Sequence, residues 1–348
     1  MNPELELLVN MVGIQSFSGK EMECTKYLEE TLPSYGWDKS FLDEAGNIVA
    51  SRGKGEKEIL LLGHIDTVPG GPPFQLEEEV LWGRGAVDAK GSLAVFAVAG
   101  GRVAIPPGWK VTLVGAVCEE TDSRGALHRL SRHQPWACVI GEPSGMTGVT
   151  LGYRGHLRFI LSGKDGGAHR SGDPGPLTAC VRAAAEILAF IDSRDETDKP
   201  VIERPSAAVA SMEGKDAGER RASVDLDIRV PIGTSPDSLA DMIYPIVRDK
   251  GLEMEVVSSL DAHMVGKNDP VVRAFRTAIR RKGHKPRLLA KGGTADFNIA
   301  ARWGCPMAAY GPGDSHLDHT SEERLHLNEY SGSIQILEDT LGKLMNES

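Results

Sequence analysis

The sequence predicts an α/β fold in which a domain with a mostly parallel sheet is interrupted by an inserted α+β domain. Three compact apolar runs are separated by two helical segments: runs 58–64, 110–117 and 137–141, helices 89–103 and 122–132. That order favours parallel pairing with helices on both faces of the sheet. From about residue 154 alternating strands replace these runs, and after about residue 262 the first pattern returns. We therefore expect residues 1–153 and 262–348 to form one domain around an inserted domain of residues 154–261.

The first domain is expected to begin with two helices and a hairpin. Residues 3–13 and 19–32 repeat apolar side chains at helical spacing, and Ser18 is placed to cap the second helix. The segment 42–52 has the pattern of a hairpin with its turn at Gly46 and Asn47. After the insert, the pattern predicts a helix, a short strand and a final helix, near 269–282, 306–310 and 328–345.

The insert has the pattern of an antiparallel sheet with one buried face. Its strand-like segments are 155–164, 201–214 and 221–231, and its helical segments are 175–193 and 235–248. Few of these strands are continuous apolar runs, which distinguishes them from buried parallel strands. We expect an antiparallel sheet covered by two helices, acting as a lid or dimerisation domain.

Composition excludes several classes of protein. The chain has 39 basic and 49 acidic residues, a net charge of −10, which argues against a nucleic-acid binder or a protein held on an anionic membrane. No apolar run approaches the roughly 20 residues that a membrane-spanning helix needs. The N-terminus lacks the basic start and apolar stretch of a signal peptide, and the 5 cysteines form no C-x-x-C pair. We expect a cytoplasmic protein with reduced thiols.

Acidic and histidine residues follow the ends of the predicted strands. They are found in separate loops of the first domain: His64 and Asp66, Asp88, Glu119 and Glu120, Glu142, and His319. In open α/β sheets, ligands bind at the carboxyl edge of the strands. These side chains are therefore expected to meet on one rim of one sheet.

The residue types suit a pair of divalent metal ions. Imidazole and carboxylate groups bind zinc at about 2.0–2.2 Å, and two such ions lie about 3.5–4 Å apart in two-metal sites. One bridging carboxylate and four terminal ligands would complete the pair. Asp66 is placed two residues after His64, where it can accept the other ring N–H of that histidine.

Other polar residues are expected to take no part in this chemistry. The acidic doublet Glu322–Glu323 is expected to be solvated, and surface positions are expected for His128, His133, His263, His284 and His326. His316 competes with His319 as a ligand. The segment WGRGAVDAKG matches neither phosphate-binding template, because Asp88 stands at the position of the last glycine and Lys90 lacks the required glycine spacing.

With these segments in view, the chain resembles the zinc-dependent exopeptidase and deacylase family that includes carboxypeptidase G, acetylornithine deacetylase and succinyl-diaminopimelate desuccinylase. The matching segments run from about residue 60 to 325: LLLGHIDTVP, GRGAVDAKGSLA, VGAVCEETDSRG, VIGEPS, GKDGGAH, GGTADFN and YGPGDSHLDHTSEE. The resemblance implies a di-metal catalytic domain and a dimer.

The resemblance also implies roles for individual residues. It assigns His64 and Glu142 to one metal ion and Glu120 and His319 to the other, with Asp88 as the bridge. Glu119 would be the general base and Asp66 the partner of His64. His319 is favoured over His316 because the family's histidine is followed four residues later by an acid, here Glu323. Within the insert, His169 would hold the oxyanion at the neighbouring subunit's site, and substrate binding is implied for Arg229, Gly293 and Thr294.

Within the family, the chain is most similar to hydrolases that release lysine or ornithine from a small amino-group carrier protein, in lysine and arginine biosynthesis. That likeness implies cleavage of a linear amide with two divalent ions, zinc by default, with cobalt or manganese as substitutes. A carrier that holds the amino acid through a glutamate side chain favours a basic entrance to the active site. The candidates for that entrance are Arg154, Arg158, Arg170 and Arg229. The alternative is an N-acetyl-lysine or N-acetyl-ornithine deacetylase or a related metallo-exopeptidase. Two-metal phosphoester hydrolysis and a metal-free binding protein remain as hypotheses from other classes.

Overall fold

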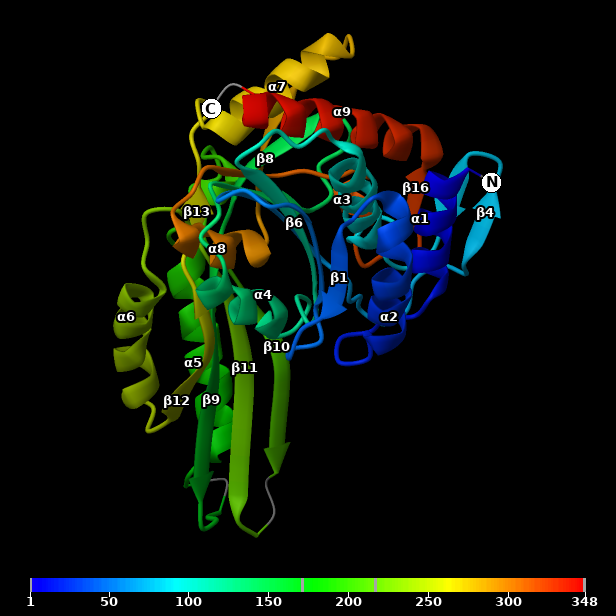
Figure 1. Cartoon of the computed structure of the whole chain (residues 1–348). Coiled ribbons are helices and arrows are strands. Elements are labelled where there is room, and N and C mark those ends of the chain that lie inside the picture. The colour runs from blue at the N-terminus through cyan, green and yellow to red at the C-terminus, as the bar shows by residue number, and fades with distance from the viewer. Residues whose placement is uncertain (1, 170–171, 216–217, 347–348) are drawn as a thin grey trace. The chain divides into compact units, whose positions relative to one another are not determined.

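The structure, a computed structural model, describes residues 2–169, 172–215 and 218–346 (Figure 1). The chain divides into two compact units. The first comprises Met1–Leu151, Val265–Leu289 and Ala295–Ser348, and the second comprises Gly152–Met264 and Ala290–Thr294. The second unit thus includes the short stretch Ala290–Thr294, which the boundaries drawn from the sequence left in the first domain. No helix in the described ranges combines the length and apolar character needed to cross a membrane.

The first unit follows the predicted alternation of strands and helices. Its helices are α1 (Pro3–Gly13), α2 (Met22–Thr31), α3 (Lys90–Arg102), α4 (Arg124–Arg129), α7 (Pro270–Arg281), α8 (Asp296–Ala300) and α9 (Leu327–Asn346). Its strands are β1 (Lys39–Leu42), β2 (Ile48–Gly53), β3 (Lys57–His64), β4 (Gln75–Glu77), β5 (Val80–Trp82), β6 (Trp109–Ala116), β7 (Ala137–Gly141), β15 (Met307–Ala309) and β16 (Arg324–His326), and β8 (Gly148–Tyr153) and β14 (Arg287–Lys291) reach the unit boundary.

Parallel pairing at the centre of the main sheet confirms the predicted fold class. Within the described residues this sheet has nine strands, in the order β1-β2-β6-β3-β7-β15-β8-β13, with β14 beside β8 and with β13 formed by His263–Met264. β3 pairs in parallel with β6 and β7, and β15 pairs in parallel with β7. β1, β2 and β8 run antiparallel to their neighbours. In Figure 1, α7 and α9 lie on one side of this sheet and α4 and α8 on the other.

Strand register places the ends of the central strands at one level. His64, the last residue of β3, pairs with Ala116, the last residue of β6, and Gly63 pairs with Gly141, the last residue of β7. Leu60, Leu61 and Leu62 of β3 are fully buried, as the predicted apolar run requires. The residues directly after these strands are therefore neighbours at one edge of the sheet.

The second unit is an antiparallel sheet with two helices. Its elements are β9 (Gly155–Asp165), α5 (Gly175–Asp192), β10 (Ser206–Lys215), β11 (Arg220–Val230), α6 (Pro236–Arg248), β12 (Glu253–Leu260) and β13 (His263–Met264). The strand order is β10-β11-β9-β12, and every neighbouring pair is antiparallel. Alternate side chains of β9 and β11, such as Phe159 and Leu226, form a separate core with the two helices. Sequence analysis missed β12, because its outward residues include valines and break the alternation.

Two local expectations were wrong. Ser18 does not cap α2, because the N-cap of that helix is Glu21. The Ser18 hydroxyl donates instead to Asp66 Oδ2 at 2.7 Å. His133 is buried rather than exposed, because its ring lies between Glu58 and Arg129. One ring nitrogen is 3.1 Å from Glu58 Oε2, and the other accepts from Arg129 Nε at 3.0 Å.

Candidate metal centre

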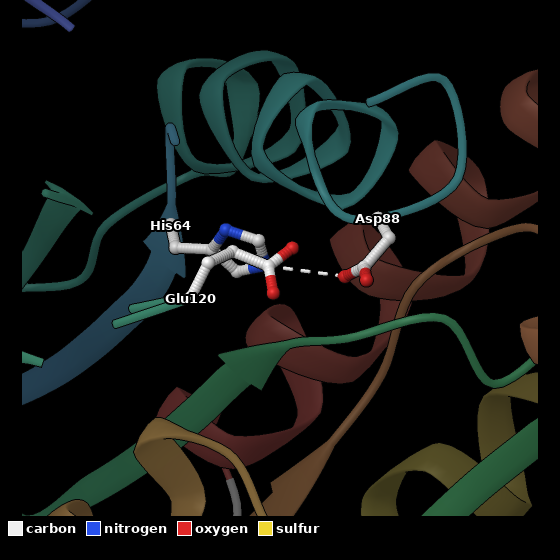
Figure 2. Close-up of side chains that lie close together, drawn as sticks. All are labelled: His64, Asp88 and Glu120. Atoms are coloured by element: carbon white, nitrogen blue, oxygen red, sulfur yellow. Dashed lines mark hydrogen bonds and ion pairs between the residues drawn. The ribbon is translucent and has the colours of Figure 1, made fainter. Parts of the chain in front are cut away.

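The predicted rim residues meet at the carboxyl ends of β3, β6 and β7. His64 ends β3, Glu119 and Glu120 follow β6, and Glu142 follows β7. The ligand atoms of His64, Asp88 and Glu120 all lie within 4.8 Å of one another (Figure 2). Residues separated in sequence thus form one cluster because parallel strands end together.

Asp88 lies between two histidines and presents one oxygen to each. Its Oδ1 is 3.2 Å from His64 Nε2, the contact drawn in Figure 2, and its Oδ2 is 3.0 Å from His319 Nε2. Burial acts to raise the pKa of Asp88, but the hydrogen bonds with His319 and His64 outweigh it and hold the pKa below its usual range. This two-sided arrangement is the one that a bridging carboxylate needs.

Asp66 orients both His64 and the loop after β6. The backbone carbonyl of Asp66 is 3.0 Å from His64 Nδ1, and its carboxylate is 3.5 Å from the same nitrogen. The two carboxylate oxygens accept the backbone N–H groups of Glu119 at 3.0 Å and Glu120 at 3.1 Å. Burial opposes ionisation, but hydrogen bonds from His64, Ser18 and the backbone of Glu120 keep the pKa of Asp66 below its usual value. The fully buried Asp66 therefore stays ionised and orients neighbouring groups.

Two further buried side chains hold the segment before Glu119. Asn47 Oδ1 accepts the backbone N–H of Val117 at 3.0 Å, and its amide donates to the carbonyl of Gly125 at 3.0 Å. Glu21 Oε1 accepts the N–H of Cys118 at 3.1 Å, where the backbone turns through φ 61. Sequence analysis placed Asn47 only in a hairpin turn and did not single out Glu21, since each is distant in sequence from the loop that it holds.

His319, and not His316, reaches the cluster. His319 Nε2 is 3.0 Å from Glu120 Oε1 as well as 3.0 Å from Asp88, and these hydrogen bonds raise the pKa of His319 to about 10. The side chain of His316 is 91% exposed and contacts Asp314. The geometry therefore favours His319 where the sequence alone left both histidines open.

The cluster contains more buried carboxyl groups than imidazoles, a set of donors that suits divalent cations. Burial raises the pKa of Glu142 to about 8, with the charge of Asp88 adding to the shift. Burial likewise raises the pKa of Glu119 well above its usual value, and the charge of Glu142 adds to it while that of His64 opposes it. Uncompensated buried carboxylates are costly. Imidazole and carboxylate donors facing one another fit zinc or a similar ion.

Glu323 and Asp296 are buried acids beside the cluster that sequence analysis missed. Glu323 is completely buried, so the expectation of a solvated doublet was wrong for this residue. Its position four residues after His319 was the signal for a specific role. Asp296, at the start of α8, is 2% exposed, and burial raises its pKa to about 7. Asp296 is the acid of the GGTADFN segment, one of the segments that carry the family resemblance.

The second unit contains the other predicted residues. His169 lies in the loop between β9 and α5, where its carbonyl accepts the N–H groups of Gly172 at 2.9 Å and Asp173 at 3.1 Å. Arg220 joins the two ends of that loop by contacts with Asp165 Oδ2 at 2.6 Å and Asp173 Oδ2 at 2.8 Å.

The predicted substrate-binding residues also lie in this unit. Arg229 donates to Thr294 Oγ1 at 2.6 Å, and Gly293 precedes Thr294 in the stretch between β14 and α8. Arg158, one of the basic candidates, is paired with Asp225 at 2.6 Å. Arg170, another of them, lies outside the described residues.

The model of peptidase family M20/M25/M40 matches residues 60–343, which include every rim residue named above. The chain belongs to this family. Among its relatives is a [LysW]-lysine hydrolase of Deinococcus radiodurans, 36% identical over 98% of this chain and 96% of the relative. A putative [LysW]-lysine/[LysW]-ornithine hydrolase of Thermococcus kodakarensis is 38% identical over 98% of this chain and 92% of the relative.

Solved structures share the fold at lower identity. An M20 metallo-carboxypeptidase of Sulfolobus solfataricus, Sso-CP2, superposes with a TM-score of 0.81 at 19% identity, over 99% of this chain and 100% of that one. Human carnosine dipeptidase 1 gives a TM-score of 0.75 at 15% identity, over 98% and 96% of the two chains. These two structures agree with the predicted fold class and say nothing of the substrate of this chain.

Proposed function

We propose that this chain is a metal-dependent hydrolase that releases lysine, ornithine or both from a small amino-group carrier protein by cleaving a linear amide. The observation that supports the chemistry most strongly is the His64–Asp88–His319 arrangement, in which one carboxylate faces two imidazoles. Sequence identities of 36% and 38% to [LysW]-lysine and [LysW]-lysine/[LysW]-ornithine hydrolases, each over 98% of this chain, support the substrate class. As an enzyme of lysine and arginine biosynthesis, it is expected in the cytoplasm.

In the proposed site, His64 and Glu142 would hold one ion, Glu120 and His319 would hold the other, and both ions would share Asp88. Zinc is the expected metal, and cobalt is a workable substitute. When bound, the ions polarise the scissile carbonyl and lower the pKa of a bound water toward about 7. Each terminal ligand lies at a strand end or in a loop next to the sheet.

In this proposal Glu119 transfers protons and Asp66 positions its neighbours. Glu119 is the general base in this proposal: it takes a proton from the attacking water and returns it to the leaving amine. Asp66 fixes the orientation of His64 and, by accepting the N–H of Glu119, the position of the base. His169 is proposed to stabilise the oxyanion at the partner subunit's site, and Arg229, Gly293 and Thr294 to bind the released amino acid.

A homodimer is supported by the edge of the second sheet. β10 ends the strand order, and its side chains include Val209 at 39% and Met212 at 44% exposure. Apolar edge strands of this kind tend to pair with another chain. Pairing of β10 across a two-fold axis would join two second units.

A protein substrate is further supported by a basic segment whose last residue borders a loop of the rim. Segment 267–287 has 8 basic residues and 1 acid in a chain with a net charge of −10. At its end, the N–H of Arg287 donates to the carbonyl of Thr147 at 2.8 Å, and a Cβ on Gly145 would lie 2.8 Å from the Arg287 guanidinium. Arg287 therefore borders the loop that follows Glu142. We expect the carrier's docking surface to be acidic.

A substrate panel tests this proposal against its alternative. Zinc-loaded protein is incubated with the lysyl and ornithyl carrier conjugates, acetyl-lysine, acetyl-ornithine and dipeptides, and free amino acid is measured. We expect the highest kcat/KM for a carrier conjugate, with a KM that rises with salt because the docking is electrostatic. Preference for an acetylated amino acid would instead identify a deacetylase, and preference for dipeptides an exopeptidase.

A further inference from the structure

The completely buried carboxylate of Glu323 binds the loop that contains Asp88. Its Oε1 accepts three backbone N–H groups, from Gly85 at 2.9 Å, Val87 at 3.0 Å and Asp88 at 3.1 Å. Its Oε2 forms an ion pair with Arg84 at 2.5 Å. Successive N–H groups converge on one oxygen because the backbone turns at Gly85, whose φ is 87. A carboxylate with this many donors is fixed in place.

The same residue belongs to the loop that contains His319. Arg84 also donates to the carbonyl of Thr320 at 3.3 Å, and the N–H of Gly83 donates to the carbonyl of Glu323 at 3.3 Å. The ladder between β5 and β16 continues this connection, since Trp82 pairs with Arg324. The loops that contain Asp88 and His319 therefore both adjoin the β5–β16 ladder. The contacts of Arg84 and Glu323 hold the two loops together.

We propose that Glu323 is a positioning residue that sets the distance between Asp88 and His319, and thereby the strength of the metal site that these two residues share. The inference rests on the proposed function, because it takes Asp88 and His319 to be ligands. His64 ends β3 and Glu142 directly follows β7, so their positions do not depend on Glu323. Loss of Glu323 thus weakens the ion held by Glu120 and His319 more than the other.

Retention of zinc by the holoenzyme tests this role. Wild-type protein and Glu323→Gln are loaded with zinc and dialysed against rising concentrations of a chelator, and retained zinc is counted by elemental analysis. Glutamine keeps the size of the side chain but places an amide where Arg84 requires an oxygen. We expect the variant to retain one ion like the wild type and to lose the other at about 10- to 100-fold lower chelator concentration, the usual cost of altering a group behind a metal ligand.

Glu322→Gln is the matched control, because its carboxylate is 65% exposed and adjacent in sequence; it should retain both ions. A second readout is rescue: excess zinc should restore kcat of Glu323→Gln with KM unchanged, which a loss of folded protein would not allow. Equal retention of both ions by Glu323→Gln, or loss of both together, would overturn the proposal. A wild-type protein that never holds two ions would overturn the two-metal function as well.

If Glu323→Gln does not fold, Arg84→Gln decides the question. This change leaves the three N–H contacts of Glu323 in place and removes its charged partner, together with the contact of Arg84 with the carbonyl of Thr320. We expect the same ion to be lost at a chelator concentration a few-fold lower than for the wild type. Retention identical to that of the wild type would overturn the role of the Glu323 ion pair in positioning the two loops.

Discussion

Glu119→Gln should lose most of the turnover while the protein keeps its metal ions. The glutamine amide preserves the side chain's volume but cannot take a proton from the attacking water. Because general base catalysis contributes about 10²–10⁴-fold, we expect kcat to fall by that factor with little change in KM. Product release is measured by a steady-state assay, and bound zinc by elemental analysis of the same samples.

Asp122→Asn is the control for Glu119→Gln. Asp122 lies on the same loop, is 56% exposed and pairs only locally with Arg124 at 3.0 Å. Its substitution should leave both turnover and metal content unchanged. Near-normal activity of Glu119→Gln would show that another group takes the proton, and the assignment of Glu119 as base would then be wrong.

Asp88→Asn should lose metal as well as activity. The amide presents one oxygen where the carboxylate presents two, so it cannot face His64 and His319 in the same way. We expect weaker zinc retention and a fall in kcat on the order of 10³-fold or more, because metal ions supply several kcal/mol of transition-state stabilisation. Elemental analysis and the steady-state assay test the two effects separately.

Asp314→Asn provides the comparison for Asp88→Asn. Asp314 is 64% exposed and contacts His316 at 2.7 Å, near the His319 loop. Normal zinc and turnover are expected for this variant. If Asp88→Asn retained both ions with wild-type stoichiometry, Asp88 would not be the bridge between them.

The part of the site formed at strand ends was predictable from local sequence. ILLLGH, VTLVGAVCEE and ACVIGE are each an apolar run that leads into a proposed metal ligand. Because parallel strands end at one edge, such runs place their following residues together without knowledge of the loops. The strands β3, β6 and β7 confirm this reasoning.

Contacts distant in sequence could not be predicted in the same way. Ser18 had the pattern of a helix cap, yet its hydroxyl donates to Asp66, 48 residues away. Glu323 belongs to an acidic doublet in a polar segment, and nothing local indicates that it accepts the N–H of Val87, 236 residues away. The pairing of distant backbone N–H groups with a buried acid depends on the conformations of loops. Hydrophobic periodicity does not predict those conformations.

Hydrolysis of the lysyl carrier conjugate in ¹⁸O-labelled water tests the central claim most directly. If the metal centre activates water against the amide that joins lysine to the carrier, one ¹⁸O atom appears in the carrier's newly formed carboxylate and none in lysine. The label should be incorporated with zinc-loaded protein and not after zinc is removed by chelation. Cleavage without label in the carrier, or labelling that persists equally without metal, would contradict the account.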